Sequence, residues 1–276
     1  MNTNYTITLT FGDVGENHKG MQMLGTMVKK GDGFNLDDLK TIKKNFEDIA
    51  CKCKIVNLNK YLDKYFDNSD TDDDIDESKF PDDAYILIIS EGIQELLNNT
   101  SDTYDDLCEE QLGLSYDKKA FMYGRIVNKN ARYNLCFDDK EQKPDYENGK
   151  GTIVAYKSMP ILNNLVKRFP DMFGAKFKNM KCESNYYYDV TKTGIGYHGD
   201  SERRKVVAIR LGNRLDIHYQ WYHHNKPIGE HIKLELNGGD IYVMSEKAVG
   251  TDWKSSSQYT LRHATGCDRF TDVNKN

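Results

Sequence analysis

Alternating apolar and polar residues over short stretches predict that much of this chain forms strands. Residues 5–11 read Tyr-Thr-Ile-Thr-Leu-Thr-Phe, which has the two-residue period of a half-buried strand. We expect further strands over residues 185–190, 205–211, 217–222, 232–236, 240–244 and 259–266. Turn sequences such as Asn237-Gly238-Gly239 separate several of them. Short strands at regular turn spacing predict a sandwich or a jelly-roll barrel.

Helical spacing is clearest near residue 40. Apolar residues recur at Leu39, Ile42, Phe46 and Ile49, and Asn35 precedes them as a candidate N-cap, so we expect a helix with one apolar face. A second helix is expected over residues 161–169, stopped by Pro170, and a weaker helical pattern covers residues 17–30. Residues 121–127 and 132–137 resemble a hairpin rich in basic and aromatic side chains.

The chemistry-bearing residues are concentrated in the second half of the chain. Residues 1–115 carry strands and helices but no chemical signature, so we expect an N-terminal module, or an elaboration packed on the main domain, followed by a domain over residues 116–276. The acidic stretch at 67–77 lacks the central glycine of a calcium-binding loop and has no glutamate at the position where such a loop needs its final ligand.

Composition narrows the class of protein. The net charge of −5 over 276 residues gives no general attraction to nucleic-acid backbones. No apolar run is long enough to span a bilayer and the first ten residues show no secretion signal, so we expect a protein that stays where it is made. The six cysteines have no disulfide-framework spacing and are expected to be reduced thiols.

The strongest chemical signal is the stretch Gly194-Ile195-Gly196-Tyr197-His198-Gly199-Asp200. On an extended backbone His198 and Asp200, two residues apart, project from the same face. An imidazole and a carboxylate side by side supply two of the three ligands of the 2-His-1-carboxylate site that binds non-haem Fe(II). Later histidines at 218, 223, 224, 231 and 263 are the candidates for the third ligand.

The glycines of the same stretch also match the dinucleotide-binding pattern Gly-x-Gly-x-x-Gly. That fingerprint requires a helix directly after it, because the pyrophosphate rests on the helix N-terminus. Residues 205–211 read instead as a strand, so we expect these glycines to allow close backbone approach rather than to bind a nucleotide.

Residues 120–270 resemble an Fe(II)/2-oxoglutarate dioxygenase, closest to the AlkB-like branch. The resemblance rests on a tyrosine-bearing strand, then Gly-x-His-x-Asp, a Val-Val-x-x-x-Leu-Gly strand, the strand over 240–244 and a distal histidine, in that family's order. The whole chain also resembles uncharacterised members of the superfamily in large DNA viruses and phages, which implies a location in the host cytoplasm. The implied fold is α+β: a double-stranded β-helix (jelly-roll) core with flanking helices and an N-terminal α/β elaboration.

The resemblance implies roles for particular residues. His198, Asp200 and His263 match the iron ligands, and Tyr186 and Tyr188 match the strand that lines the 2-oxoglutarate pocket. The basic residue that holds the distal carboxylate of 2-oxoglutarate has two candidates, Arg269 beyond the distal histidine and Arg210 on the strand after the motif, with a slight preference for Arg269.

The implied reaction couples decarboxylation of 2-oxoglutarate by O₂ to hydroxylation of a C–H bond. The AlkB-like branch implies a modified nucleobase as substrate, with Tyr123, Arg125 and Arg132 of the basic hairpin as candidate contacts. The acidic net charge favours the alternative, a protein side chain or a small molecule. A non-catalytic jelly-roll binding module is the alternative outside the enzymes.

Overall fold

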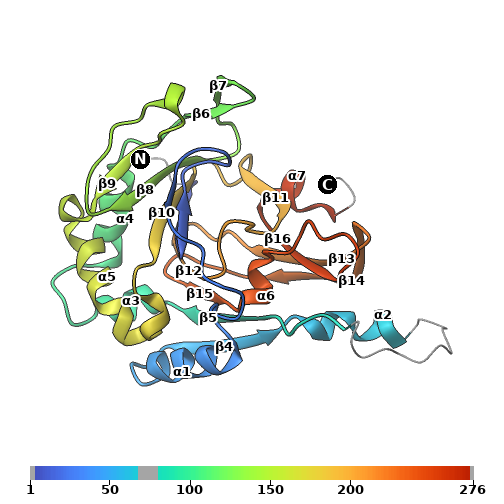
Figure 1. The fold of residues 1–276 in the computed structure, drawn as a ribbon. Helices are drawn as coiled ribbons and strands as arrows, with labels where there is room; N and C mark the ends of the chain where they lie inside the picture. Colours follow the sequence, from blue (N-terminus) through green and yellow to red (C-terminus); the bar gives the residue numbers. More distant parts are fainter. Residues whose placement is uncertain (1–3, 68–79, 274–276) are drawn as a thin grey trace.

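The chain forms a mixed α/β fold built mostly from antiparallel strands (Figure 1). The computed structural model describes residues 4–67 and 80–273, so the acidic stretch considered as a calcium loop lies almost wholly outside the described residues. A large sheet has eight strands in the order β4-β5-β15-β12-β1-β10-β8-β9, and a small sheet has four in the order β11-β16-β13-β14.

All strand pairs of the two sheets are antiparallel except β8 with β9. The large sheet contains β1 (Thr6–Gly12), β4 (Lys52–Asn57), β5 (Tyr85–Ser90), β8 (Tyr133–Asp138), β9 (Ile153–Ala155), β10 (Lys181–Tyr187), β12 (Val206–Gly212) and β15 (Ile241–Met244). The small sheet contains β11 (Gly194–His198), β13 (Ile217–His223), β14 (Lys226–Leu234) and β16 (Thr260–Gly266). Two separate hairpins are β2 (Val14–Glu16) with β3 (Met23–Gly25), and β6 (Lys119–Met122) with β7 (Arg125–Asn128).

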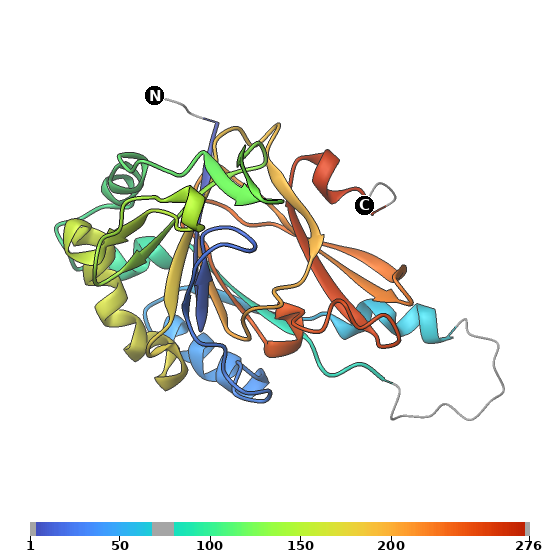
Figure 2. The ribbon, with the colours of Figure 1, turned by 45° about the horizontal axis from the view of Figure 1, so that its top comes forward.

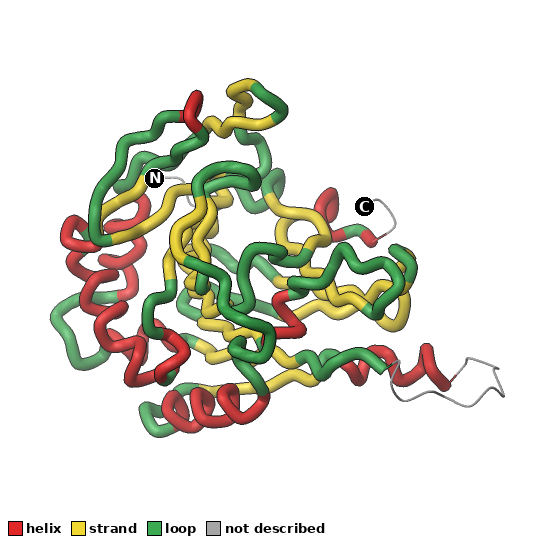
Figure 3. The backbone as a smooth tube through the Cα atoms, in the orientation of Figure 1, coloured by secondary structure: helices red, strands yellow, loops and turns green. Residues whose placement is uncertain are grey.

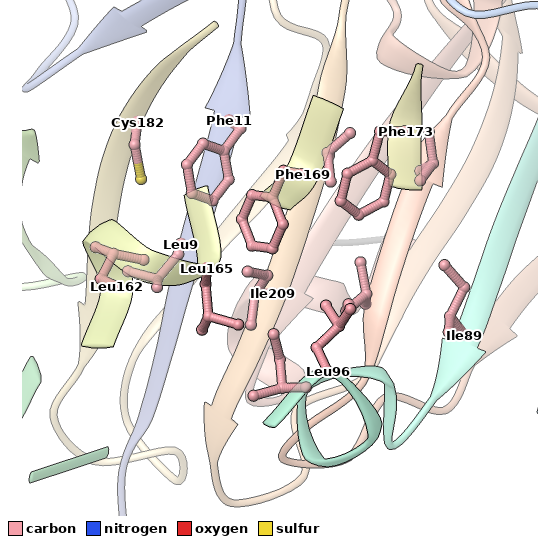
Figure 4. Packing of buried hydrophobic residues seen from close by; sticks show 14 of the residues in the cluster. Leu9, Phe11, Ile89, Leu96, Leu162, Leu165, Phe169, Phe173, Cys182 and Ile209 are labelled. Carbon is pink, nitrogen blue, oxygen red and sulfur yellow. The ribbon is translucent and has the colours of Figure 1, made fainter. Parts of the chain in front are cut away.

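Helices cover one face of the large sheet (Figures 1 and 3). They are α1 (Leu36–Glu47), α3 (Gly92–Leu97), α4 (Tyr104–Leu112) and α5 (Pro160–Phe173). Figure 4 shows Leu162, Leu165 and Phe169 of α5 against Leu9 and Phe11 of β1, all buried in one apolar cluster. The shorter helices are α2 (Asp63–Asp67), α6 (Glu246–Val249) and α7 (Asp268–Thr271). In the described part of the chain, no helix has the length and apolar character needed to cross a membrane.

The other face of the large sheet packs on the small sheet (Figure 2). Val206 and Ala208 of β12 meet Tyr219 and Trp221 of β13 in a second buried cluster. Along β12 the alternate residues Val207, Ile209 and Leu211 belong to the helix-side cluster instead. Arg210 lies between Ile209 and Leu211 in β12. Its side chain therefore points to the opposite face, into the space between the two sheets.

Several predicted elements are confirmed. Strands occur at or near each predicted stretch, and α1 begins after Asn35, whose side chain accepts hydrogen bonds from the backbone N–H groups of Asp37 and Asp38. Leu39, Ile42 and Phe46 of α1 are buried as expected, whereas Ile49 lies beyond the end of the helix and is half-buried. No disulfide joins the cysteines, as predicted.

Two helix predictions were wrong. Residues 17–30 hold no helix: β2 pairs with β3, and Met23 and Met27 are exposed rather than forming an apolar core face. Helix α5 does not stop at Pro170 but continues to Phe173, because Phe169 and Phe173 are both buried in the helix-side cluster and this packing outweighs the missing backbone N–H of the proline.

The expected hairpin also differs from the structure, and residues 1–115 contribute strands to the large sheet. The hairpin turns at Tyr123 and Gly124, and Tyr133–Asp138 forms a strand of the large sheet because it pairs with β10. The large sheet contains strands from both sides of residue 115. Strand β1 lies between β10 and β12, and β5 pairs with β15. Residues before and after that position thus build one sheet and one core.

Candidate metal centre

Strand pairing brings together three side chains that are far apart in the sequence. His198 ends β11 and lies directly opposite His263 of β16 in the antiparallel ladder. Asp200 follows His198 after one glycine and turns back toward both rings. One ligand atom from each of the three side chains lies within 4.8 Å of the others, as a metal site requires.

The distances leave room for an ion between the ligand atoms. Asp200 Oδ1 lies 3.5 Å from His198 Nε2 and 3.7 Å from His263 Nε2. An ion about 2.1 Å from each atom, in octahedral geometry, needs separations of roughly 3.0 Å. The two separations that involve Asp200 would therefore have to shorten by less than 1 Å, and the two imidazole ligand atoms, which lie within 4.8 Å of each other, would have to close toward the same distance.

Hydrogen bonding orients the first imidazole and leaves the second with an unused nitrogen. His198 Nδ1 lies 2.8 Å from the Gly196 carbonyl oxygen, so it carries the proton and its Nε2 lone pair points toward Asp200. His263 is buried, and its Nδ1 has no hydrogen-bond partner among the described residues.

Burial sets the charge state of the three groups. It lowers the pKa of His263 to about 3, with His198 adding to the effect, and it also lowers the pKa of His198. For Asp200 burial raises the pKa, but Arg203 and the two imidazoles more than offset this and the pKa is lowered. Near neutral pH the site is thus two neutral imidazoles and a carboxylate, each with a lone pair for a cation.

Arg203 supports Asp200 from behind. Its Nε lies 3.6 Å from Asp200 Oδ2, the oxygen that faces away from the imidazoles. The same buried guanidinium contacts Glu183 Oε2 at 2.7 Å and Glu202 Oε1 at 3.0 Å. Because Oδ2 faces this cation, Oδ1 is the oxygen presented to an ion.

A cavity of about 60 Å³ opens beside the three candidate ligands. A single water needs roughly 10–15 Å³, so the cavity accommodates several water-sized groups. Polar residues from three strands of the large sheet line it, namely Thr8, Thr10, Glu183, Asn185, Tyr187 and Arg210. Its lining thus combines the candidate ligands with hydroxyl, amide and guanidinium groups.

Of the two arginines considered for the carboxylate of the co-substrate, Arg210 is the one that lines this cavity. It is 1% exposed, donates to the Thr8 hydroxyl and, over 3.0 Å, to the Thr265 hydroxyl. Its Nε is buried without a partner in the described part of the chain. The preferred candidate, Arg269, lies instead on the exposed surface of α7, over the Phe270 ring at 5.5 Å.

The two tyrosines expected at the cofactor pocket do not line it. Tyr186 faces the helix side of the sheet, where its ring contacts Tyr5 and Tyr116. Tyr188 lies beyond the end of β10 and stacks on Tyr133 at 4.4 Å. Tyr187, the residue between them, lines the cavity because successive strand residues alternate between faces.

The candidate substrate contacts lie at different depths. Tyr123 is 88% exposed at the tip of the β6–β7 hairpin, and Arg125 is exposed next to it. Arg132, between β7 and β8, lines the cavity together with His198 and Asp200. Of the three, only Arg132 reaches the candidate metal centre.

Sequence reasoning missed several cavity residues, which occupy alternate positions along two strands. In β10, Glu183, Asn185 and Tyr187 alternate with Cys182, Ser184 and Tyr186, and in β1 the threonines alternate with Ile7, Leu9 and Phe11. For the glycines the expectation was correct: strand β12, and not a helix, follows them. A Cβ at Gly199 would lie 2.0 Å from the Gly250 carbonyl oxygen, which explains this close approach.

A larger open groove of about 1430 Å³ lies elsewhere, between residues 30–37 and 245–259. It includes Phe34, Tyr85 and Tyr259 but none of the three candidate ligands. The convergent ligand atoms lie beside the smaller cavity, so that cavity is the candidate site.

Comparison with known proteins shows that the chain is similar to a viral protein. No model of a known protein family matches the chain. A protein of Acanthamoeba polyphaga mimivirus, described as "Uncharacterized protein R156", is 46% identical over 265 residues, which span 96% of this chain and 97% of the mimivirus protein.

Proposed function

We propose that this chain, which belongs to the same family as the mimivirus protein, is an Fe(II)/2-oxoglutarate-dependent oxygenase that hydroxylates a C–H bond. The observation that carries the proposal is the convergence of His198, Asp200 and His263 beside a polar cavity. Two neutral imidazoles and one carboxylate form the donor set that suits non-haem Fe(II) and leaves coordination positions open.

The fold is compatible with this proposal. We interpret the large and small sheets as the two sheets of a double-stranded β-helix, with the helices flanking the outer face of the large one. All three candidate ligands come from β11, the turn after it and β16, at the edge where the small sheet faces β10 and β12. A metal held by these three residues would be shielded by both sheets.

The chain's own residues have distinct tasks in this proposal. Fe(II) and 2-oxoglutarate, when bound, supply the oxidising chemistry. Asp200 is held by Arg203 so that a single oxygen faces the ion. Arg210, with the Thr8 and Thr265 hydroxyls, provides the grip for the distal carboxylate of 2-oxoglutarate, since a guanidinium matches a carboxylate in shape and charge.

The candidate substrates are ranked by what lies around the cavity. A modified nucleobase comes first, because an exposed hairpin bearing Tyr123 and Arg125 is available to stack on and hold a nucleic-acid strand. Hydroxylation of a protein side chain or small molecule is the second enzyme candidate, favoured by the net charge of −5. A jelly-roll that only binds would retain the cavity but form no succinate.

Conversion of 2-oxoglutarate to succinate in the absence of other substrate tests the proposal. The purified protein with Fe(II), ascorbate and O₂ should form succinate slowly, and His198→Ala and His263→Ala should abolish this. His224→Ala, at an exposed histidine outside the cavity, is the matched control and should behave as wild type. Succinate formation that persists in both ligand variants would contradict the assignment.

A further inference from the structure

Two arginines line the candidate cavity without an acidic partner. Within the described residues, neither Arg210 nor Arg132 has a carboxylate oxygen within ion-pair distance. Arg203, close by, has three such partners. The proposed function assigns one anion, the distal carboxylate of 2-oxoglutarate, to Arg210, which leaves Arg132 without a counter-charge.

Arg132 is held firmly by a chain of polar contacts. Its Nε donates to Asn185 Oδ1 over 2.7 Å, and the described residues accept no hydrogen bond from its two terminal nitrogens. Asn185 in turn donates to Glu183 Oε1 over 2.9 Å, and Glu183 accepts from Arg203. The guanidinium is therefore fixed at one edge, and its other donors remain available to a ligand.

The carboxylates that share the cavity with Arg132 pair with another cation: Asp200 Oδ2 lies 3.6 Å from Arg203 Nε, and no carboxylate of the described residues lies within ion-pair distance of Arg132. Buried Lys129 donates to Asn17 Oδ1 over 3.0 Å, and burial lowers its pKa to about 8. Burial, followed by the charges of Lys129 and Arg132, lowers the pKa of nearby His18 to about 4. The one carboxylate in the chain of contacts, Glu183, is already paired with Arg203.

We propose that Arg132 binds an oxyanion, a phosphate or carboxylate group of the primary substrate, so that the enzyme acts on an anionic molecule. Two nitrogens of a planar guanidinium donate in parallel to such a group, and the charges assist both bonds. Because Arg132 shares the cavity with His198 and Asp200, an oxyanion bound there holds the neighbouring atoms of the substrate beside the metal centre. This inference rests on the proposed function, which supplies the metal and the co-substrate.

Matched pairs of small probes test this inference on the full chain loaded with redox-silent Mn(II) and 2-oxoglutarate. One pair is thymidine 5′-monophosphate and thymidine, and the other is N-acetylaspartate amide and N-acetylasparagine amide. Calorimetry on wild type should show at least one anionic probe binding about tenfold or more tighter than its neutral counterpart. The pair that differs identifies the anion as phosphate or carboxylate.

Variants assign the effect to Arg132. Arg132→Gln should remove the preference for the anionic probe, Arg132→Lys should keep part of it, and Lys143→Gln, which removes an exposed charge outside the cavity, should keep all of it. The far-UV circular dichroism of Arg132→Gln should match that of wild type, which shows that the variant is folded.

Two results would overturn the inference in distinguishable ways. If wild type binds Mn(II) and 2-oxoglutarate but prefers neither anionic probe, or if Arg132→Gln retains the preference, Arg132 does not bind a substrate anion while the proposed function stands. If wild type does not bind 2-oxoglutarate with Mn(II), the proposed function fails and this inference fails with it.

Discussion

Replacing Arg203 by methionine would test whether the buried ion pairs behind Asp200 stabilise the candidate metal centre. The Arg203 side chain is 3% exposed and its Nη2 lies 2.7 Å from Glu183 Oε2, whose side chain is 9% exposed. Methionine keeps much of the aliphatic volume but leaves the carboxylates of Glu183 and Asp200 without their cation. The substitution should destabilise the fold and loosen Asp200 together.

The expected magnitude follows from the burial. Removing one partner of a buried ion pair costs about 3–5 kcal/mol, because the remaining charge is left uncompensated. With a urea m-value of about 3 kcal/mol/M, the midpoint of unfolding should fall by about 1 to 1.7 M. Mn(II) affinity of the folded variant should fall by about 10- to 100-fold, since Asp200 loses the group that orients it.

Two further variants make the measurement specific. Arg203→Met combined with Glu183→Gln should recover part of the stability, because Glu183 then carries no charge to compensate. Arg214→Met is the matched control: Arg214 Nε lies 2.7 Å from Asp216 Oδ1 but its side chain is 45% exposed, so solvent screens the pair and the loss should be much smaller. Equal urea midpoints for Arg203→Met and Arg214→Met would refute the reasoning.

Three other predictions concern separate parts of the molecule. Asn35→Ala should lower the free energy of unfolding by about 1 kcal/mol, measured in urea, because it removes the N-cap of α1; an unchanged midpoint would contradict this. Burial and the neighbouring His231 lower the pKa of His218 to about 4 from 6.5, so the unfolded state takes up a proton between these pH values that the native state does not. The free energy of unfolding of wild type should therefore fall as the pH drops through this window. In urea unfolding, the free energy of His218→Gln should depend less steeply on pH. An identical pH dependence in wild type and variant would exclude the effect. Arg210→Lys should weaken 2-oxoglutarate binding to the Mn(II) protein roughly tenfold or more, while Arg269→Gln should leave it unchanged; calorimetry showing the reverse would return the role to Arg269.

Local pattern predicted the elements whose stability is local. The alternation of threonine with Ile7, Leu9 and Phe11 marks β1, and Asn35 followed by helical spacing marks α1. The histidine-aspartate pair is also local, since its geometry follows from the two-residue period of a strand. The prediction that this pair meets His263 assumed that two distant strands pair. In the structure β11 pairs with β16, and His198 lies opposite His263.

The remainder depends on long-range pairing that one sequence does not encode locally. Both faces of β10 are buried, so composition alone does not indicate that Tyr187 faces the cavity while Tyr186 faces the helices. The choice between Arg210 and Arg269 likewise required knowing that β12 lies between β1 and β15. The place of β1 between β10 and β12 also depends on pairing with strands far along the chain.

The most direct test of the central claim is the absorbance of the protein mixed with Fe(II) and 2-oxoglutarate without oxygen. If His198, Asp200 and His263 hold the iron and leave room for the chelate, the mixture should show a weak visible charge-transfer band that needs both additions. His263→Ala should lack this band while its far-UV circular dichroism matches wild type. A wild-type mixture without the band, or an equal band in His263→Ala, would contradict the account.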